Sequence, residues 1–192
     1  MCHGRYVMPL SPIEREILEA IEPILQVQGC ELVRVHVSCL PDIEVKIFVD
    51  NSCNKSPICV EKLKKIHLLI QDFLPVMSQQ KLLPGAYHLQ VSSPGLNRPL
   101  TRLQHFQNAL GKPVCVRFTH ADRKKSQTGV LLDVQESGIV LKDLDELAAR
   151  SLLLQWHEMQ EVVLNEFSYR AVQKGLAAKS STAVKREKLC RK

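Results

Sequence analysis

The stretch HLQVSSPGLNRPL, residues 88–100, decides how this chain is organised. It continues an alternation of apolar and polar residues that runs from Tyr87 to Ser92, which is the period of a half-buried strand. Pro94 and Gly95 then turn the chain, because proline presets φ at the first corner of a turn and glycine accepts the positive φ of the second. The pattern predicts a strand that leaves a sheet, turns and continues as an extended segment.

Two interpretations of this segment follow from its residues. One is a tight turn between domains, since serine, asparagine, proline and glycine dominate turns for local reasons. The other is a rigid loop that presents side chains to a partner, with these candidate partner-binding residues: Ser92, Ser93, Pro94, Gly95, Leu96, Asn97, Arg98 and Pro99. Arg98 is the best candidate for a phosphate or carboxylate contact, because its guanidinium fork binds both. On this second interpretation, replacing Arg98 with alanine weakens partner binding and leaves the thermal midpoint near that of the wild type.

The ten residues VSSPGLNRPL, Val91–Leu100, closely resemble the signature loop of the bacterial ribosome maturation factor RimP family, which usually has Asp at the position of Asn97. The resemblance extends over roughly residues 13–167. It implies an α+β N-terminal domain followed by an SH3-like small β-barrel. It also implies a non-enzymatic cytoplasmic factor that binds the immature small ribosomal subunit, through ribosomal protein or rRNA, and assists its assembly.

The residues before the loop predict a two-layer αββαβ domain over residues 1–99. Ser11 and Glu14 form a capping box with proline at the first helical position, and Pro75 is the expected end of the second helix. Two amphipathic helices suffice to cover one face of a three-stranded sheet. The predicted elements are a helix between Ser11 and Gly29, strands over residues 31–39 and 43–49, a helix over 57–74 and a strand over 87–92.

The residues after the loop predict a small β-barrel domain over residues 100–167, which begins with a short helix over 101–110 and continues in short strands. Several short strands separated by turns are typical of a small barrel or sandwich, and barrel closure would remove the exposed edges. The predicted strands lie at 114–118, 129–135, 139–141, 152–156 and 162–164, with a helical turn at 145–150.

The positive charge of the chain is concentrated in a flexible tail, residues 168–192. Residues 1–99 have no net charge, residues 100–167 carry −1 and the tail carries +7. Basic tails bind nucleic acid by releasing counterions, although a tail that serves only solubility has the same composition. The candidate nucleic-acid-binding residues are Arg123, Lys124 and Lys125 in a predicted barrel loop, and Lys185 and Arg186 in the tail. A general RNA chaperone is therefore the alternative function.

The composition argues against several other classes of protein. A hydrophobic content of 45% excludes wholesale disorder, and an aromatic content of 5% disfavours surfaces that stack bases. The seven cysteines form no C-x-x-C pair, which predicts reduced thiols and no metal site. No Walker A motif, dinucleotide fingerprint or catalytic serine elbow occurs, so we expect no cofactor, no small-molecule substrate and no enzymatic activity. The sequence predicts neither a signal peptide nor a membrane span, and we expect a monomer.

Overall fold

The computed structural model describes residues 5–39, 41–52, 56–78, 86–120, 123–143 and 151–165. The chain divides into two compact units. The first is Pro9–Thr101, and the second consists of Met1–Met8 with Arg102–Lys192. The domain boundaries expected at residues 99 and 167 stay a prediction. The expected helical turn at 145–150 and the tail from 168 lie outside the described residues.

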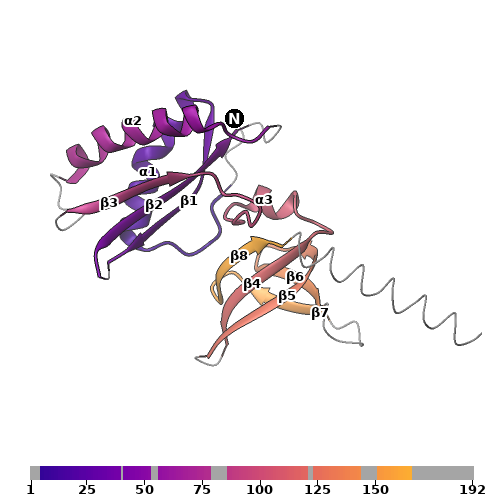
Figure 1. Ribbon diagram of the computed structural model, residues 1–192. Coiled ribbons are helices and arrows are strands. Elements are labelled where there is room, and N and C mark those ends of the chain that lie inside the picture. Colours follow the sequence, from indigo (N-terminus) through magenta and orange to yellow (C-terminus); the bar gives the residue numbers. More distant parts are fainter. Residues whose placement is uncertain are drawn as a thin grey trace, which may run out of the picture. The chain divides into compact units, whose positions relative to one another are not determined.

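The Pro9–Thr101 unit contains two helices and a three-stranded sheet (Figure 1). The strands follow the order β1-β2-β3, with β1 antiparallel to β2 and β2 parallel to β3. The predicted αββαβ order is therefore confirmed, and α2 forms the crossover between the two parallel strands. The elements are α1 (Pro12–Val27), β1 (Cys30–Ser38), β2 (Ile43–Asn51), α2 (Val60–Ser78) and β3 (Tyr87–Ser92).

Helix α1 begins where its capping box predicts. The hydroxyl of Ser11 accepts a hydrogen bond from the backbone N–H of Glu14 at 3.3 Å. The Glu14 carboxylate accepts one from the backbone N–H of Ser11 at 2.9 Å, so two of the N–H groups at this helix start are satisfied by side chains. Gly29 follows the helix with a φ of 65°, a conformation that glycine adopts without steric cost.

Helix α2 differs from its prediction at both ends. It starts at Val60 and continues to Ser78, so Pro75 does not end it. A proline inside a helix removes one backbone hydrogen bond but does not prevent packing. Ile66, Ile70 and Leu74, one turn apart, are all at most 2% exposed. Burial of this stripe stabilises the helix more than one missing hydrogen bond weakens it.

One face of the sheet is buried against the helices, and the other is polar. On β2, Val45, Ile47 and Val49 are 0% exposed, whereas the alternate residues are only half-buried. The helices complete this core with Ile17, Leu18, Ile21 and Leu25 from α1, and Ile66, Ile70 and Leu74 from α2. The opposite face carries the charged side chains of β1 and β2, and it is there that the segment after β3 makes its contacts.

The second unit is built on a five-stranded antiparallel sheet of order β7-β6-β5-β4-β8 (Figure 1). Its helix α3 is shorter than predicted, and β5 starts six residues before the predicted strand. The pairings found among the described strands include none between β7 and β8, so closure into a barrel stays a prediction. The elements are α3 (Leu103–Gln107), β4 (Pro113–His120), β5 (Arg123–Val134), β6 (Gly138–Asp143), β7 (Ser151–Gln155) and β8 (Met159–Leu164).

An aromatic pair anchors α3 in this second unit. Phe106 is 0% exposed, and its ring meets that of Trp156 edge to face, with 5.0 Å between centroids and 74° between planes. The indole N–H of Trp156 donates to the backbone oxygen of Glu136 at 2.9 Å. Across the described parts of both units, no helix combines the length and hydropathy needed to cross a membrane.

Candidate docking surface

The loop that follows β3 leaves the sheet at the end of its parallel pairing with β2. The last paired residues are Ser92 on β3 and Phe48 on β2. Gly95 has a φ of 65°, and no atom lies within 4 Å of the position that a Cβ would take there. Gly95 thus has the positive φ expected of it, whereas the chain bends at Leu96 and Asn97, just after the expected Pro94-Gly95 turn.

The tip of this loop is exposed. Ser93, Gly95, Leu96 and Asn97 are all exposed, and Leu96 has 65% of its surface accessible. A leucine of this exposure on a turn with a defined backbone conformation is a candidate anchor for a partner, because burying it on binding would remove apolar area from water. We call Ser93–Asn97 the loop tip.

The base of the loop is held inside its own unit by Arg98. The Nη1 atom of Arg98 contacts Oδ2 of Asp50, and Nη2 lies 3.3 Å from Oε2 of Glu31. All three side chains are largely buried, at 15% exposure for Arg98 and Asp50 and 9% for Glu31. The guanidinium fork therefore spans two carboxylates, and carboxylates are the groups that its geometry suits.

The chain after Arg98 is also fixed. Pro99 and Leu100 are buried, and the hydroxyl of Thr101 donates to the backbone oxygen of Val33 on β1 at 2.6 Å. The loop is thus anchored by an ion-pair cluster and a buried hydrogen bond, while its tip protrudes. These contacts fix the base of the loop, as expected for a loop that presents side chains to a partner. They fit a structural turn equally well, so they do not distinguish the two interpretations.

Residues 20–97 match the protein-family model described as the RimP N-terminal domain. The N-terminal domain of this chain belongs to the RimP family. The match covers all three strands of the first sheet and ends at Asn97, so it contains the loop tip. The resemblance drawn from VSSPGLNRPL is confirmed for this RimP N-terminal domain.

The candidate partner-binding residues of the RimP N-terminal domain differ in exposure. Ser93, Gly95, Leu96 and Asn97 are exposed at the tip. Ser92 and Pro94 are half-buried, whereas Arg98 contacts carboxylates of its own unit and Pro99 is buried. The role expected for Arg98 as a partner contact stays a prediction, but its two terminal nitrogens already contact carboxylates of the same domain.

The two carboxylates that receive Arg98 were not predicted from the sequence. Glu31 and Asp50 are direct partners in the β1–β2 register. The register next to the hairpin turn would pair Glu31 with Asn51, and a β-bulge between Leu32 and Arg34 shifts it by one residue so that Glu31 faces Asp50. Nothing in the local sequence pattern indicates this bulge, so the facing carboxylates could not be read from the hairpin alone.

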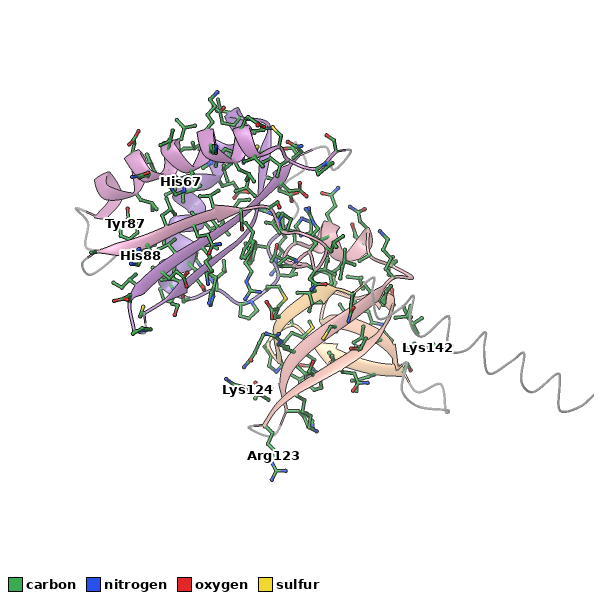
Figure 2. The ribbon with its side chains drawn as sticks, viewed as in Figure 1. His67, Tyr87, His88, Arg123, Lys124 and Lys142 are labelled. Carbon is green, nitrogen blue, oxygen red and sulfur yellow. The ribbon has the colours of Figure 1, made fainter. Side chains whose placement is uncertain are left out.

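The basic cluster Arg123–Lys125 was expected in a loop, and this placement is wrong. These residues begin β5 and pair with β4, Arg123 with His120 and Lys125 with Phe118. The ladder extends to the hairpin end because β4 supplies backbone partners there, even though the lysines bury no apolar surface. All three basic side chains are exposed. Figure 2 shows Arg123 and Lys124 together at the hairpin end and Lys142 well apart from them.

The remaining site predictions concern cysteines, metals and the tail. Cys30, Cys39, Cys59 and Cys115 are free thiols. No group of three or more metal-ligating side chains occurs among the described residues. Lys185 and Arg186 lie outside the described residues, so their expected contact with nucleic acid stays a prediction.

Proposed function

We propose that this protein is a non-enzymatic, cytoplasmic ribosome maturation factor that binds the immature small ribosomal subunit and assists its assembly. The observation that carries the proposal is the RimP N-terminal domain over residues 20–97. The proposed docking element is the segment Ser92–Pro99, whose exposed tip carries Leu96 at 65% accessibility on an anchored base. The protein would act by binding and positioning alone.

We further propose that residues 100–167 form an SH3-like barrel. Two features support this: the strand order β7-β6-β5-β4-β8 and the short turn that joins its two outer strands. In that turn the backbone N–H of Glu158 donates to the backbone oxygen of Gln155 at 3.1 Å. Two outer strands joined so tightly have their ends close together, which is the arrangement from which a small barrel closes.

Gradient sedimentation tests the proposed function. A cell lysate that contains the full chain is separated on a sucrose gradient, and the chain is detected in small-subunit, large-subunit and free fractions. We expect it with small-subunit particles, at higher occupancy on precursors than on mature subunits. Recovery only in the free fraction, or equally with large subunits, would contradict the proposal.

A general RNA chaperone is the second candidate, because Arg123–Lys125 form an exposed basic hairpin end and the tail adds a charge of +7. Truncation after Phe167 separates the two functions. Loss of nearly all RNA binding, together with loss of its salt dependence, would favour the chaperone. Small-subunit binding that survives the truncation favours docking through the folded units.

A further inference from the structure

β3 is an edge strand of the sheet that the described strands form. In the order β1-β2-β3, β2 pairs with one side of β3, and no strand of the described part of the chain pairs with the other. Proline and charged side chains on an edge strand are among the features that block further pairing. The β3 sequence YHLQVS contains no proline, lysine, arginine, aspartate or glutamate. Within the part of the chain that the structure describes, the outer N–H and C=O groups of β3 are therefore open to pairing with another strand.

A continuous groove runs along this edge, between β3 and α2. It consists of two adjoining hollows of about 460 and 610 Å³, and His67 on α2 lines both. The first hollow is apolar and includes Leu63 and Val91. The second is polar and includes Tyr87 and His88. Figure 2 shows these two side chains on β3 beneath His67.

The groove leaves apolar surface uncovered. Leu89 and Val91 of β3 pair with Val45 and Ile47 of β2, which are 0% exposed. Leu89 and Val91 themselves are only half-buried. Across the groove, Val60 and Leu68 of α2 are 61% and 59% exposed. Exposed apolar groups gathered along one groove are a feature of binding surfaces, unlike apolar residues scattered singly.

We propose that this groove and the outer edge of β3 bind an extended peptide segment of another protein, which adds a fourth strand to the sheet. In strand addition, main-chain hydrogen bonds supply affinity, and pockets for alternate side chains supply specificity. From Tyr87 to Val91 the groove is about 13 Å long, at roughly 3.3 Å per residue, so it fits a strand of about five residues.

The charges at the two ends of the groove define the partner further. Lys64 lies at the end that contains Val91, and Asp72 lies at the end that contains Tyr87. An occupant with complementary charges has apolar side chains at alternate positions, an acidic residue towards Lys64 and a basic residue towards Asp72. This inference concerns a peptide partner of the first unit, and it does not depend on the proposed ribosomal function.

Selection from a displayed library of random peptides tests the proposal. The full chain is the target, and Leu68→Asp is used for counter-selection. Enriched peptides are expected to alternate apolar and polar residues and to carry the two end charges. Synthetic copies should bind Leu68→Asp at least about tenfold more weakly, because an apolar contact is replaced by a buried carboxylate. They should bind Val27→Asp as they bind the wild type, since Val27 is 83% exposed at the end of α1, outside the groove.

Further measurements decide between modes of binding. Two peptides with the enriched sequence are N-methylated, one at the odd and one at the even positions. Only one of the two should lose binding, because only every second N–H of a strand donates to the edge of β3. No enrichment over Leu68→Asp, apolar residues at helical spacing, or insensitivity to N-methylation would each overturn the proposal. Concentration-dependent dimerisation that Leu68→Asp abolishes would also overturn it, by assigning the groove to a second copy. If Leu68→Asp fails to fold by circular dichroism, Val60→Asp takes its place in every step.

Discussion

Glu31 on β1 and Asp50 on β2 lie directly opposite each other, so the hairpin brings two carboxylates together on one face of the sheet. Like charges at facing positions of an antiparallel pair destabilise it. Arg98, 48 residues from Asp50 and 67 from Glu31 in the sequence, contacts both carboxylates. The loop after β3 therefore supplies the cation that the β1–β2 hairpin requires.

Replacing Arg98 with alanine should destabilise the Pro9–Thr101 unit by roughly 2–3 kcal/mol, because it removes the guanidinium that contacts both of two largely buried, facing carboxylates. This reverses the expectation from the sequence that the thermal midpoint would stay near wild type. Urea denaturation followed by far-UV circular dichroism measures the change, since the two long helices, α1 and α2, belong to this unit.

Two internal controls accompany this variant. Fluorescence of Trp156, the single tryptophan of the chain, reports only on the second unit and should show an unchanged transition. Arg117→Ala removes an ion pair with Glu161 in which Arg117 is 68% exposed, and it should cost less than about 1 kcal/mol. A triple variant that adds Glu31→Gln and Asp50→Asn to Arg98→Ala should recover part of the loss. An unchanged midpoint in Arg98→Ala would refute the structural role of Arg98.

Replacing Leu96 with aspartate should abolish most binding to small ribosomal subunits and leave folding unaffected. Leu96 is 65% exposed at the loop tip, so the free protein loses no core packing, while a partner pocket built for leucine would receive a charge. Co-sedimentation with purified subunit precursors measures the effect. Val27→Asp alters another exposed apolar residue elsewhere in the unit and should bind normally. Equal binding by both variants would remove the tip from the docking surface.

Replacing Arg123, Lys124 and Lys125 together with alanine should weaken RNA binding and reduce its dependence on salt. The slope of log affinity against log salt concentration is negative. Each phosphate that the variant no longer neutralises reduces the magnitude of this slope by about 0.7–0.9. Titrations of a fluorescent RNA at several salt concentrations give the slope. Lys142→Ala, which changes a lysine away from the hairpin end (Figure 2), is the control. The same slope in the wild type and the triple variant would show that the hairpin end does not bind phosphate.

Stability of the first unit should fall in alkali partly through Tyr87. Burial raises the pKa of the Tyr87 phenol above its ordinary value of 10.0. As pH rises, the unfolded chain loses the phenolic proton before the native state does. The free energy of unfolding is therefore unaffected by this group below about pH 10, and it falls as pH rises from there through the native pKa of Tyr87. Tyr87→Phe should flatten the decline of the urea midpoint between about pH 9 and pH 11. Tyr6→Phe, in the other unit, should leave the circular dichroism transition unchanged. An identical decline in the wild type and Tyr87→Phe would contradict the prediction.

The sequence alone determined the features of this protein that arise from residues close together in the chain. The capping box of Ser11 and Glu14, the positive φ of Gly95 and the alternation of β2 each follow from interactions over a few residues. The family of the N-terminal domain was also indicated by such a segment, because VSSPGLNRPL resembles the signature loop of the RimP family.

Only the tertiary structure decided where the side chains of that loop point. Arg98 contacts the two carboxylates that the β1–β2 register brings together, while the partner contact expected of it stays a prediction. Likewise, α2 continues past Pro75, where packing of its buried stripe offsets a missing hydrogen bond. The first residues of β5, from Arg123, show no alternation of apolar and polar residues that would predict a strand. Their strand conformation depends on pairing with β4. In each case the deciding energy comes from residues distant in sequence, which local periodicity and turn chemistry do not encode.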